Sequence, residues 1–363
     1  MPEIDSPITA QTKIDELVAR FPVAADVMRA FGLGCSGCSV SKYETVEQGA
    51  RAHGLRIEPI VAALERARAT GSVPPIADED RRPARRAPGA FTKRAAIAHT
   101  VPIMSGKGGV GKSLVTALLA IGLRRKHYRV GILDADITGP SIPKLFGLHE
   151  PMTVLADPVK TTPQGQPQPL ITPAISRSAI EIVSANLLTD REDTAMIWRG
   201  PIVASVIRQF YEQVLWDDLD FLLVDLPPGT SDAPLTVLQS LSIDGVVLVT
   251  MPQALATMIV RKAANLVHQL KKPILGVVEN MSYFIAPDTG ARYEIFGPSY
   301  AQRVAELAGA PVLARLPIDP NKARLADEGR IEELDDAVCD ELAGRLLDQI
   351  ATHPKPKETI SIV

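Results

Sequence analysis

A run of eight residues has the composition and spacing of a loop that binds polyphosphate. Residues 106–113 read Gly-Lys-Gly-Gly-Val-Gly-Lys-Ser and fit the pattern G-x-x-x-x-G-K-[ST] at every fixed position. Glycines let backbone N–H groups approach phosphate oxygens, because no Cβ atom stands in the way. Lys112 would contact the β- and γ-phosphates, and the Ser113 hydroxyl would ligate Mg²⁺. The residues that we predict to bind the nucleotide here are Gly106, Lys107, Gly108, Gly109, Val110, Gly111, Lys112, Ser113 and Leu114.

The same glycines also fit G-x-G-x-x-G, the fingerprint of a dinucleotide site. Asp134 ends the next apolar run, where dinucleotide folds keep an acid for the ribose. A dinucleotide site does not require a Lys-Ser pair after the third glycine, whereas a triphosphate loop does. We therefore favour the triphosphate loop.

Carboxylates follow two of the apolar runs that we predict to be strands. Asp134 and Asp136 lie at the end of the run 129–134, and Asp225 ends the run 220–225. Open α/β sheets bind their ligands at the carboxyl ends of the strands, so we expect these acids to face the phosphate loop. Asp225 has the position of the acid that holds Mg²⁺, usually through water.

From about residue 98 the chain alternates between apolar runs and segments of helical period. Runs that are apolar throughout, such as 221–224 and 245–250, are typical of a parallel sheet that is covered on both faces. We predict an α/β fold with a doubly wound, mostly parallel sheet, preceded by a small all-α domain. The predicted strands are 101–105, 129–134, 180–184, 220–225, 245–250, 273–279 and 312–316, and the predicted helices are 112–125, 202–215, 254–270, 298–308 and 331–350.

The domain boundaries follow from changes in composition. Residues 1–70 have four segments of helical period, the first with Thr12 as its expected N-cap. Residues 71–97 are rich in proline and arginine and have no apolar period, which indicates a linker. Residues 98–353 form the predicted ATPase domain, and residues 354–363 form a tail.

Cys35 and Cys38 form a C-x-x-C pair in a glycine-rich stretch of the N-terminal domain. Two thiolates at this spacing can reach one metal ion or one iron of a cluster, although they supply only half of a four-ligand site. A cluster shared between two chains would fit this count. A redox dithiol and a pair of small buried side chains are the alternatives.

The overall composition narrows the functional class. The formal net charge is −3, so no global basic field indicates a nucleic-acid partner. No run is long and apolar enough to span a bilayer, and the first residues lack the apolar core of a secretory signal. Three cysteines do not make a disulfide framework, which favours the reducing cytosol. The third, Cys339, has helical spacing with apolar neighbours and is predicted to lie in the core, and the acids around it are read as a solvated or docking face.

Lys107 adds a second cation inside the phosphate loop, five positions before Lys112. A lysine there is not needed to fold the turn. The run Ser-Gly-Lys-Gly-Gly-Val-Gly-Lys-Ser resembles the deviant phosphate loop of the MinD/ParA class of P-loop NTPases. The resemblance implies a homodimer that sandwiches ATP, in which the early lysine of one chain reaches the nucleotide of the other.

Within that class, the chain is similar to the Mrp/ApbC iron–sulfur cluster carrier ATPases over about residues 98–330. The resemblance implies that Asp136 positions the attacking water, and that Asn280 and Pro317 contact adenine. It rests on Leu133-Asp-Ala-Asp136-x-x-Gly139-Pro-Ser-Ile-Pro143, Trp198-Arg-Gly-Pro201, Asp225-Leu-Pro-Pro-Gly-Thr230, Leu235-Thr236, Gly276-Val-Val-Glu-Asn280-Met-Ser282, Ile295-Phe-Gly297 and Leu316-Pro-Ile-Asp319.

One part of that pattern is missing. Many members of the family carry C-P-x-C after the Asn-Met-Ser segment, where the cysteines hold a [4Fe–4S] cluster between two subunits. Here Ala286 and Thr289 occupy those positions, and neither side chain can replace a thiolate on iron. The region 7–70 in turn resembles a small cysteine-motif domain found beside hybrid-cluster proteins, which implies sulfur or cluster chemistry.

These observations lead to one hypothesis and three alternatives. We expect an ATP-hydrolysing homodimer with slow intrinsic turnover that carries iron–sulfur clusters to apoproteins or scaffold proteins, with Cys35 and Cys38 replacing the missing pair. The alternatives are an ATPase coupled to thiol redox or sulfur transfer, a MinD/ParA-like positioning ATPase, and an electron donor gated by ATP. The tail has two prolines and no apolar helical stripe, which argues against membrane positioning.

Overall fold

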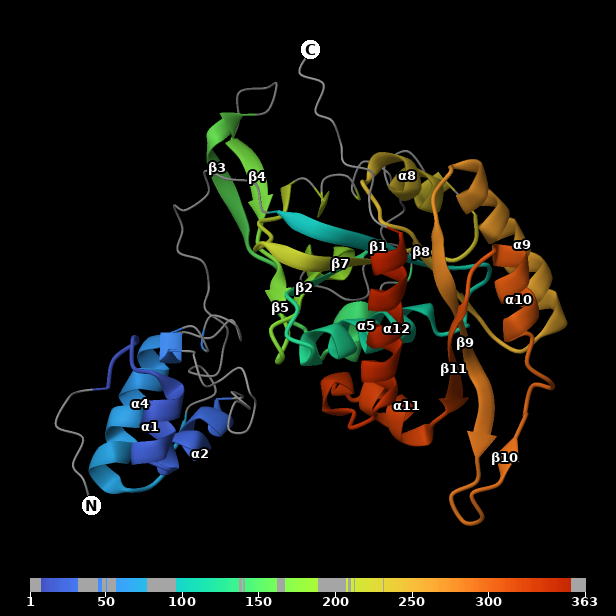
Figure 1. The fold of residues 1–363 in the computed structure, drawn as a ribbon. Coiled ribbons are helices and arrows are strands. Elements are labelled where there is room, and N and C mark those ends of the chain that lie inside the picture. The colour runs from blue at the N-terminus through green and yellow to red at the C-terminus, as the bar shows by residue number, and fades with distance from the viewer. Residues whose placement is uncertain are drawn as a thin grey trace. The chain divides into compact units, whose positions relative to one another are not determined.

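The computed structural model describes residues 8–31, 45–47, 50, 57–76, 96–136, 139, 141–161, 167–188, 207, 210–211, 213–230 and 232–353. The chain divides into two units, Met1–Thr92 and Lys93–Val363, which are described separately (Figure 1). Cys35, Cys38, the segment 77–95, the stretch 198–201 and the tail 354–363 lie outside the described residues, as does most of the predicted helix 202–215.

The first unit contains a small helical core. Its helices are α1 (Ile14–Arg20), α2 (Val23–Ala30) and α4 (Ile57–Thr70), and α2 contacts both of the others. Their buried side chains recur at helical spacing and pack together, which is the pattern that the sequence predicts. Thr12 is not the N-cap of α1, because Lys13 holds that position and the Thr12 hydroxyl accepts a hydrogen bond from the Thr9 N–H at 2.9 Å.

The second unit is built on a mostly parallel sheet. In the described part of the chain, nine strands form this sheet in the order β10-β9-β8-β1-β7-β2-β6-β5, with β11 paired to β9. The parallel strands are β1 (Ile97–Ser105), β2 (Val130–Asp134), β6 (Glu181–Ser184), β7 (Leu219–Asp225), β8 (Val246–Thr250), β9 (Ile274–Ile285) and β11 (Val312–Ile318). The short strands β5 (Ala174–Ile175) and β10 (Arg292–Tyr293) are antiparallel to β6 and β9. A separate hairpin pairs β3 (Val154–Thr161) with β4 (Pro167–Ile171).

Helices cover both faces of the sheet (Figure 1). They are α5 (Lys112–Arg125), α6 (Ile142–Leu145), α8 (Asp232–Ser240), α9 (Ala254–Gln269), α10 (Ala301–Ala308), α11 (Pro320–Asp327) and α12 (Val338–Thr352), with 3-10 turns η2 (Ala185–Leu188) and η3 (Ile331–Glu333). Helices α5 and α12 pack on one face, while α9 and α10 pack on the other. Within β8, Val247 and Val249 point into the first core and Val246 and Leu248 into the second. This two-sided burial explains why the strand is apolar throughout, and the predicted fold class is confirmed.

The C-terminal helix differs from its prediction. A single helix over 331–350 is wrong, because a 3-10 turn at Ile331–Glu333 is followed by a break before α12. Asp336 lies in this break, and its Oδ1 accepts a hydrogen bond from the Val338 N–H at 2.9 Å. Cys339 is fully buried, as predicted. A Cβ on Gly122 of α5 would overlap the carbonyl oxygen of Cys339, so this glycine lets α5 and α12 approach closely.

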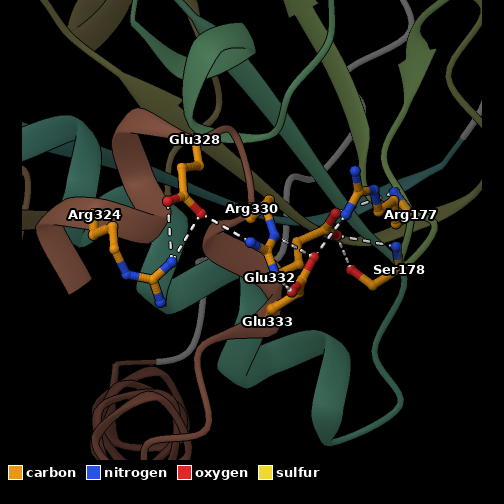
Figure 2. A network of polar contacts seen from close by, with 7 residues as sticks. All are labelled: Arg177, Ser178, Arg324, Glu328, Arg330, Glu332 and Glu333. Carbon is orange, nitrogen blue, oxygen red and sulfur yellow. Dashed lines mark hydrogen bonds and ion pairs between the residues drawn. The ribbon is translucent and has the colours of Figure 1, made fainter. Parts of the chain in front are cut away.

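Several of the acids that precede α12 form ion pairs with arginines and stay partly exposed. Figure 2 shows three of them joined to arginines and to the turn between β5 and β6. Glu332 accepts hydrogen bonds from the Ser176 hydroxyl at 2.7 Å and the Ser178 N–H at 3.0 Å. Arg330 pairs with Glu328 at 2.8 Å and also with Glu333. The network therefore fastens the η3 segment to the sheet edge.

Candidate nucleotide site

The phosphate loop connects the carboxyl end of β1 to the first turn of α5, in the centre of the sheet. Two of its glycines require their residue type. Gly111 has φ +81°, and a Cβ there would overlap the Nδ2 of Asn280. A Cβ on Gly106 would lie 2.9 Å from the backbone carbon of Ile259 in α9. The loop is thus packed tightly between α9 and β9.

Lys112, Ser113 and Asp225 converge behind the loop. Asp225 is fully buried at the end of β7, and its Oδ1 lies 2.8 Å from the Lys112 Nζ. The Ser113 hydroxyl donates to Asp225 Oδ2 at 2.5 Å, and the Thr116 hydroxyl donates to Oδ1 at 2.9 Å. A buried carboxylate needs such partners, because burying an unpaired charge is costly. The three residues that the sequence assigns to phosphate and Mg²⁺ therefore share one hydrogen-bonded cluster.

Two carboxylates at the end of β2 lie beside this cluster. Asp134 is paired in register with Asp225 across β2 and β7, and it is fully buried. The pKa of Asp134 is raised to about 8, first by burial and then by the charge of Asp225. Asp136 donates its N–H to Asp134 Oδ1 at 3.2 Å, and its Oδ2 lies 3.9 Å from the Lys112 Nζ. Asp136 is less buried than Asp134, which fits a group that meets solvent at the site.

A bulge in β9 positions Asn280. The register between β11 and β9 shifts from Arg315 opposite Glu279 to Pro317 opposite Tyr283, so extra residues accumulate on β9. Within the bulge, Met281 has φ +53°, an uncommon conformation for a side chain of this type. The Asn280 Nδ2 donates to the Val110 carbonyl at 3.0 Å.

Buried Glu279 anchors the same bulge. Its Oε2 accepts hydrogen bonds from the hydroxyls of Ser282 and Ser299, each at 2.6 Å. Its Oε1 accepts the Tyr300 N–H at 2.8 Å. The bulge that carries Asn280 is therefore held from behind by a fully buried carboxylate.

Lys107 makes a different contact from Lys112. Its Nζ donates to Gln253 Oε1 at 2.6 Å, in the loop between β8 and α9. The structure also shows contributions that sequence reasoning missed, namely Thr116 and Gln253. Thr116 had a detectable signal, because it lies one helical turn after Lys112 and so faces the same side of α5. For Gln253, the only signal in the sequence was its place shortly after a predicted strand.

The hairpin between β9 and β10 carries Ala286 and Thr289, the positions at which the resemblance described above implies cysteines. Ala286 donates its N–H to the Ala291 carbonyl at 2.9 Å, and Gly290 donates its N–H to the Ala286 carbonyl at 2.8 Å. Thr289 lies in this turn and is exposed. Among the described residues, no group of three or more His, Cys, Asp or Glu side chains is placed to hold a metal ion. The described helices also include none that is long and apolar enough to cross a membrane.

Each unit matches a known family, and the chain is similar to several curated proteins. Residues 8–61 match a domain of unknown function (DUF1858). The iron-sulfur cluster carrier protein of Clostridium perfringens is 42% identical over 237 residues, which cover 65% of this chain and 82% of that protein. The cytosolic Fe-S cluster assembly factor Nubp2 homolog of Anopheles gambiae is 40% identical over 261 residues, or 70% of this chain and 97% of that protein.

Two solved structures have a similar fold. The nucleotide-binding protein of Archaeoglobus fulgidus in complex with ADP has a TM-score of 0.56 and 40% identity, covering 67% of this chain and 90% of that chain. The cell division ATPase MinD of Pyrococcus furiosus has a TM-score of 0.50 and 20% identity, covering 70% of this chain and 99% of that chain, and it supports the fold alone. Residues 96–352 match the family model of the NUBPL iron-transfer P-loop NTPases. The chain therefore belongs to the NUBPL iron-transfer P-loop NTPase family.

Proposed function

We propose that this chain is a cytosolic, ATP-hydrolysing homodimer that carries iron–sulfur clusters and transfers them to apoproteins or scaffold proteins. The observation that carries the ATPase part is the buried cluster of Lys112, Ser113 and Asp225 behind the phosphate loop. The names of its relatives, cluster carrier and cluster assembly factor, support the cargo.

Within the proposed site, each residue has a distinct role. The loop residues from Gly106 to Leu114 surround the phosphates, and Lys112 neutralises their charge. Asn280 and Pro317 contact adenine from the β9–β11 edge, and Asp136 positions the attacking water. Lys107 reaches the nucleotide of the partner chain. Because half of each site then comes from the partner, a separated chain hydrolyses ATP slowly.

The residues present fit Mg²⁺. This hard cation prefers oxygen ligands, and the site offers the Ser113 hydroxyl and the Asp225 carboxylate 2.5 Å apart. The Lys112 ammonium, 2.8 Å from Asp225, already neutralises that buried carboxylate in the structure. Ser113 and Asp225 would hold bound Mg²⁺, and the cation would offset the charge on the triphosphate.

The position of the cluster is the part of the proposal that differs from related carriers. The hairpin turn offers a methyl group and a hydroxyl at Ala286 and Thr289, which are poor ligands for iron. We propose that Cys35 and Cys38 bind the cluster instead, with two thiolates from each chain of the dimer. The alternative use of these thiols is sulfur transfer or redox chemistry.

Anaerobic reconstitution with iron and sulfide tests the cargo. We expect iron, sulfide and a visible cluster spectrum in the wild type, and their loss in Cys35→Ala/Cys38→Ala. Cys339→Ala is the matched control, because that buried thiol faces the core and the variant should retain iron. Iron that remains in the double variant, or that is absent from the wild type, would contradict the proposed cluster position.

Nucleotide titrations test the ATPase part separately. Lys112→Ala should abolish productive ATP binding, and wild-type affinity in this variant would refute the site. Lys107→Ala should keep most of the binding and lose hydrolysis by about 10³-fold, the lower range for a cation supplied in trans. Unchanged turnover in that variant would remove the trans role.

A further inference from the structure

Lys107 is held by its own chain in this structure. Its Nζ donates to Gln253 Oε1 at 2.6 Å, and its carbonyl accepts a hydrogen bond from the Ser105 hydroxyl at 3.0 Å. Strand β1 lies beside β8 with Ser105 opposite Val249, and this pairing brings the phosphate loop next to the β8–α9 loop. The contact therefore follows from the order of strands in the sheet.

In the described part of the chain, the Gln253 side chain does not cap α9, although the residue occupies the N-cap position of that helix. It occupies the N-cap of α9, where short side chains such as Ser, Thr, Asp and Asn are preferred because their oxygens reach the first free N–H groups. Gln253 has the extended backbone expected there, with φ −137° and ψ 133°, yet within the described residues its side chain does not cap the helix. The side-chain oxygen accepts a hydrogen bond from the Lys107 Nζ instead. The missing cap of α9 and the position of the Lys107 ammonium are thus explained by the same hydrogen bond.

We propose that Gln253 is a positioning residue for Lys107, holding its ammonium within one protomer until a second protomer closes. The proposal rests on the proposed function, in which Lys107 reaches the partner's nucleotide. The bond to Gln253 stabilises the separated state relative to the closed dimer, so closure must break it. Gln253 thereby sets how much protein is needed for hydrolysis.

Hydrolysis measured against protein concentration tests this role. Gln253→Ala should lower the half-saturating protein concentration about tenfold to a hundredfold, because closure of the homodimer breaks two Lys107–Gln253 bonds, each worth about threefold to tenfold. Gln253→Glu should raise it, because a carboxylate pairs more strongly with the ammonium. In a Lys107→Ala background, Gln253→Ala should leave ATP-dependent dimerisation unchanged in sedimentation, since no ammonium remains to be held.

A second measurement does not depend on hydrolysis. Acetylation of the nucleotide-free protein with acetic anhydride, followed by mass spectrometry, reports how readily the Lys107 amine reacts. Gln253→Ala should raise the reaction rate of Lys107 severalfold relative to exposed Lys126, which serves as the internal reference. An unchanged rate would show that Gln253 does not hold the amine and would overturn the proposal.

The outcomes separate this proposal from the proposed function. A half-saturating concentration that stays constant or rises in Gln253→Ala would overturn the positioning role. So would an effect that persists in the Lys107→Ala background. If Lys107→Ala hydrolyses ATP at the normal rate, the proposed trans role of Lys107 is refuted. Faster acetylation of Lys107 in Gln253→Ala would then show that the hydrogen bond exists but does not control hydrolysis.

Discussion

Gly111→Ala should destabilise the second unit through two separable effects. The residue has φ +81°, and placing Ala in this left-handed region costs about 1 kcal/mol. The new Cβ would also overlap the Asn280 Nδ2, which must move and give up its 3.0 Å hydrogen bond to Val110. Losing that bond costs about 1 kcal/mol more. We therefore expect about 2 kcal/mol in total for the nucleotide-free protein.

Gly109 provides the matched control. It has φ +77°, and no described atom lies within 4 Å of a Cβ placed there. Gly109→Ala should thus cost only the backbone part, about 1 kcal/mol. In an Asn280→Ala background, the cost of Gly111→Ala should fall to the same value, because the overlapping amide is gone. This double-mutant cycle isolates the contact between the phosphate loop and β9.

Urea unfolding followed by tryptophan fluorescence measures these costs. Both tryptophans, Trp198 and Trp216, belong to the second unit, so the signal reports that unit alone. Equal destabilisation by Gly111→Ala and Gly109→Ala would refute the argument. A Gly111→Ala cost that does not change in the Asn280→Ala background would refute it as well.

Further variants test other parts of the second unit. Gly122→Ala should lower the free energy of unfolding by about 2 kcal/mol or more, because the new Cβ forces α5 away from α12. Gly344→Ala is the control in thermal unfolding: no described atom lies within 4 Å of its new Cβ, so this variant should be more stable by about 0.5–1 kcal/mol. Glu279→Gln places an amide among hydroxyl and N–H donors and should cost about 2 kcal/mol in urea unfolding; an equal stability would contradict the anchoring role. With the two N-terminal cysteines replaced, Cys339 should resist iodoacetamide at pH 8, because burial raises its thiol pKa to about 11; rapid alkylation of the folded protein would contradict this.

Local patterns predicted the parts of the site that depend on spacing along the chain. The glycine-rich loop, Lys112 and Ser113 follow a fixed pattern, and Asp225 follows an apolar run, so their convergence could be expected from a parallel sheet. The two-sided burial of β8 could be predicted in the same way, because an unbroken apolar run of this length is typical of a parallel strand covered on both faces.

The remaining features depend on contacts between distant segments. The β9 bulge arises where β11 pairs on either side of it, which no pattern within β9 encodes. The break before α12 was missed because apolar spacing continues through it, and the start of the helix is visible only in the structure, where Asp336 accepts the Val338 N–H. The bond between Lys107 and Gln253 joins residues 146 positions apart and follows from strand order.

Main-chain hydrogen bonds close the hairpin turn after β9, from the Ala286 N–H to Ala291 and from the Gly290 N–H to Ala286. The Ala286 side chain takes no part in these bonds, and the Thr289 hydroxyl adds one longer contact by accepting the Ala291 N–H at 3.3 Å. We therefore expect the main-chain bonds to keep the turn closed when these two side chains are replaced. The side chains that this hairpin presents are thus free to change during evolution, while the sheet that carries it stays the same.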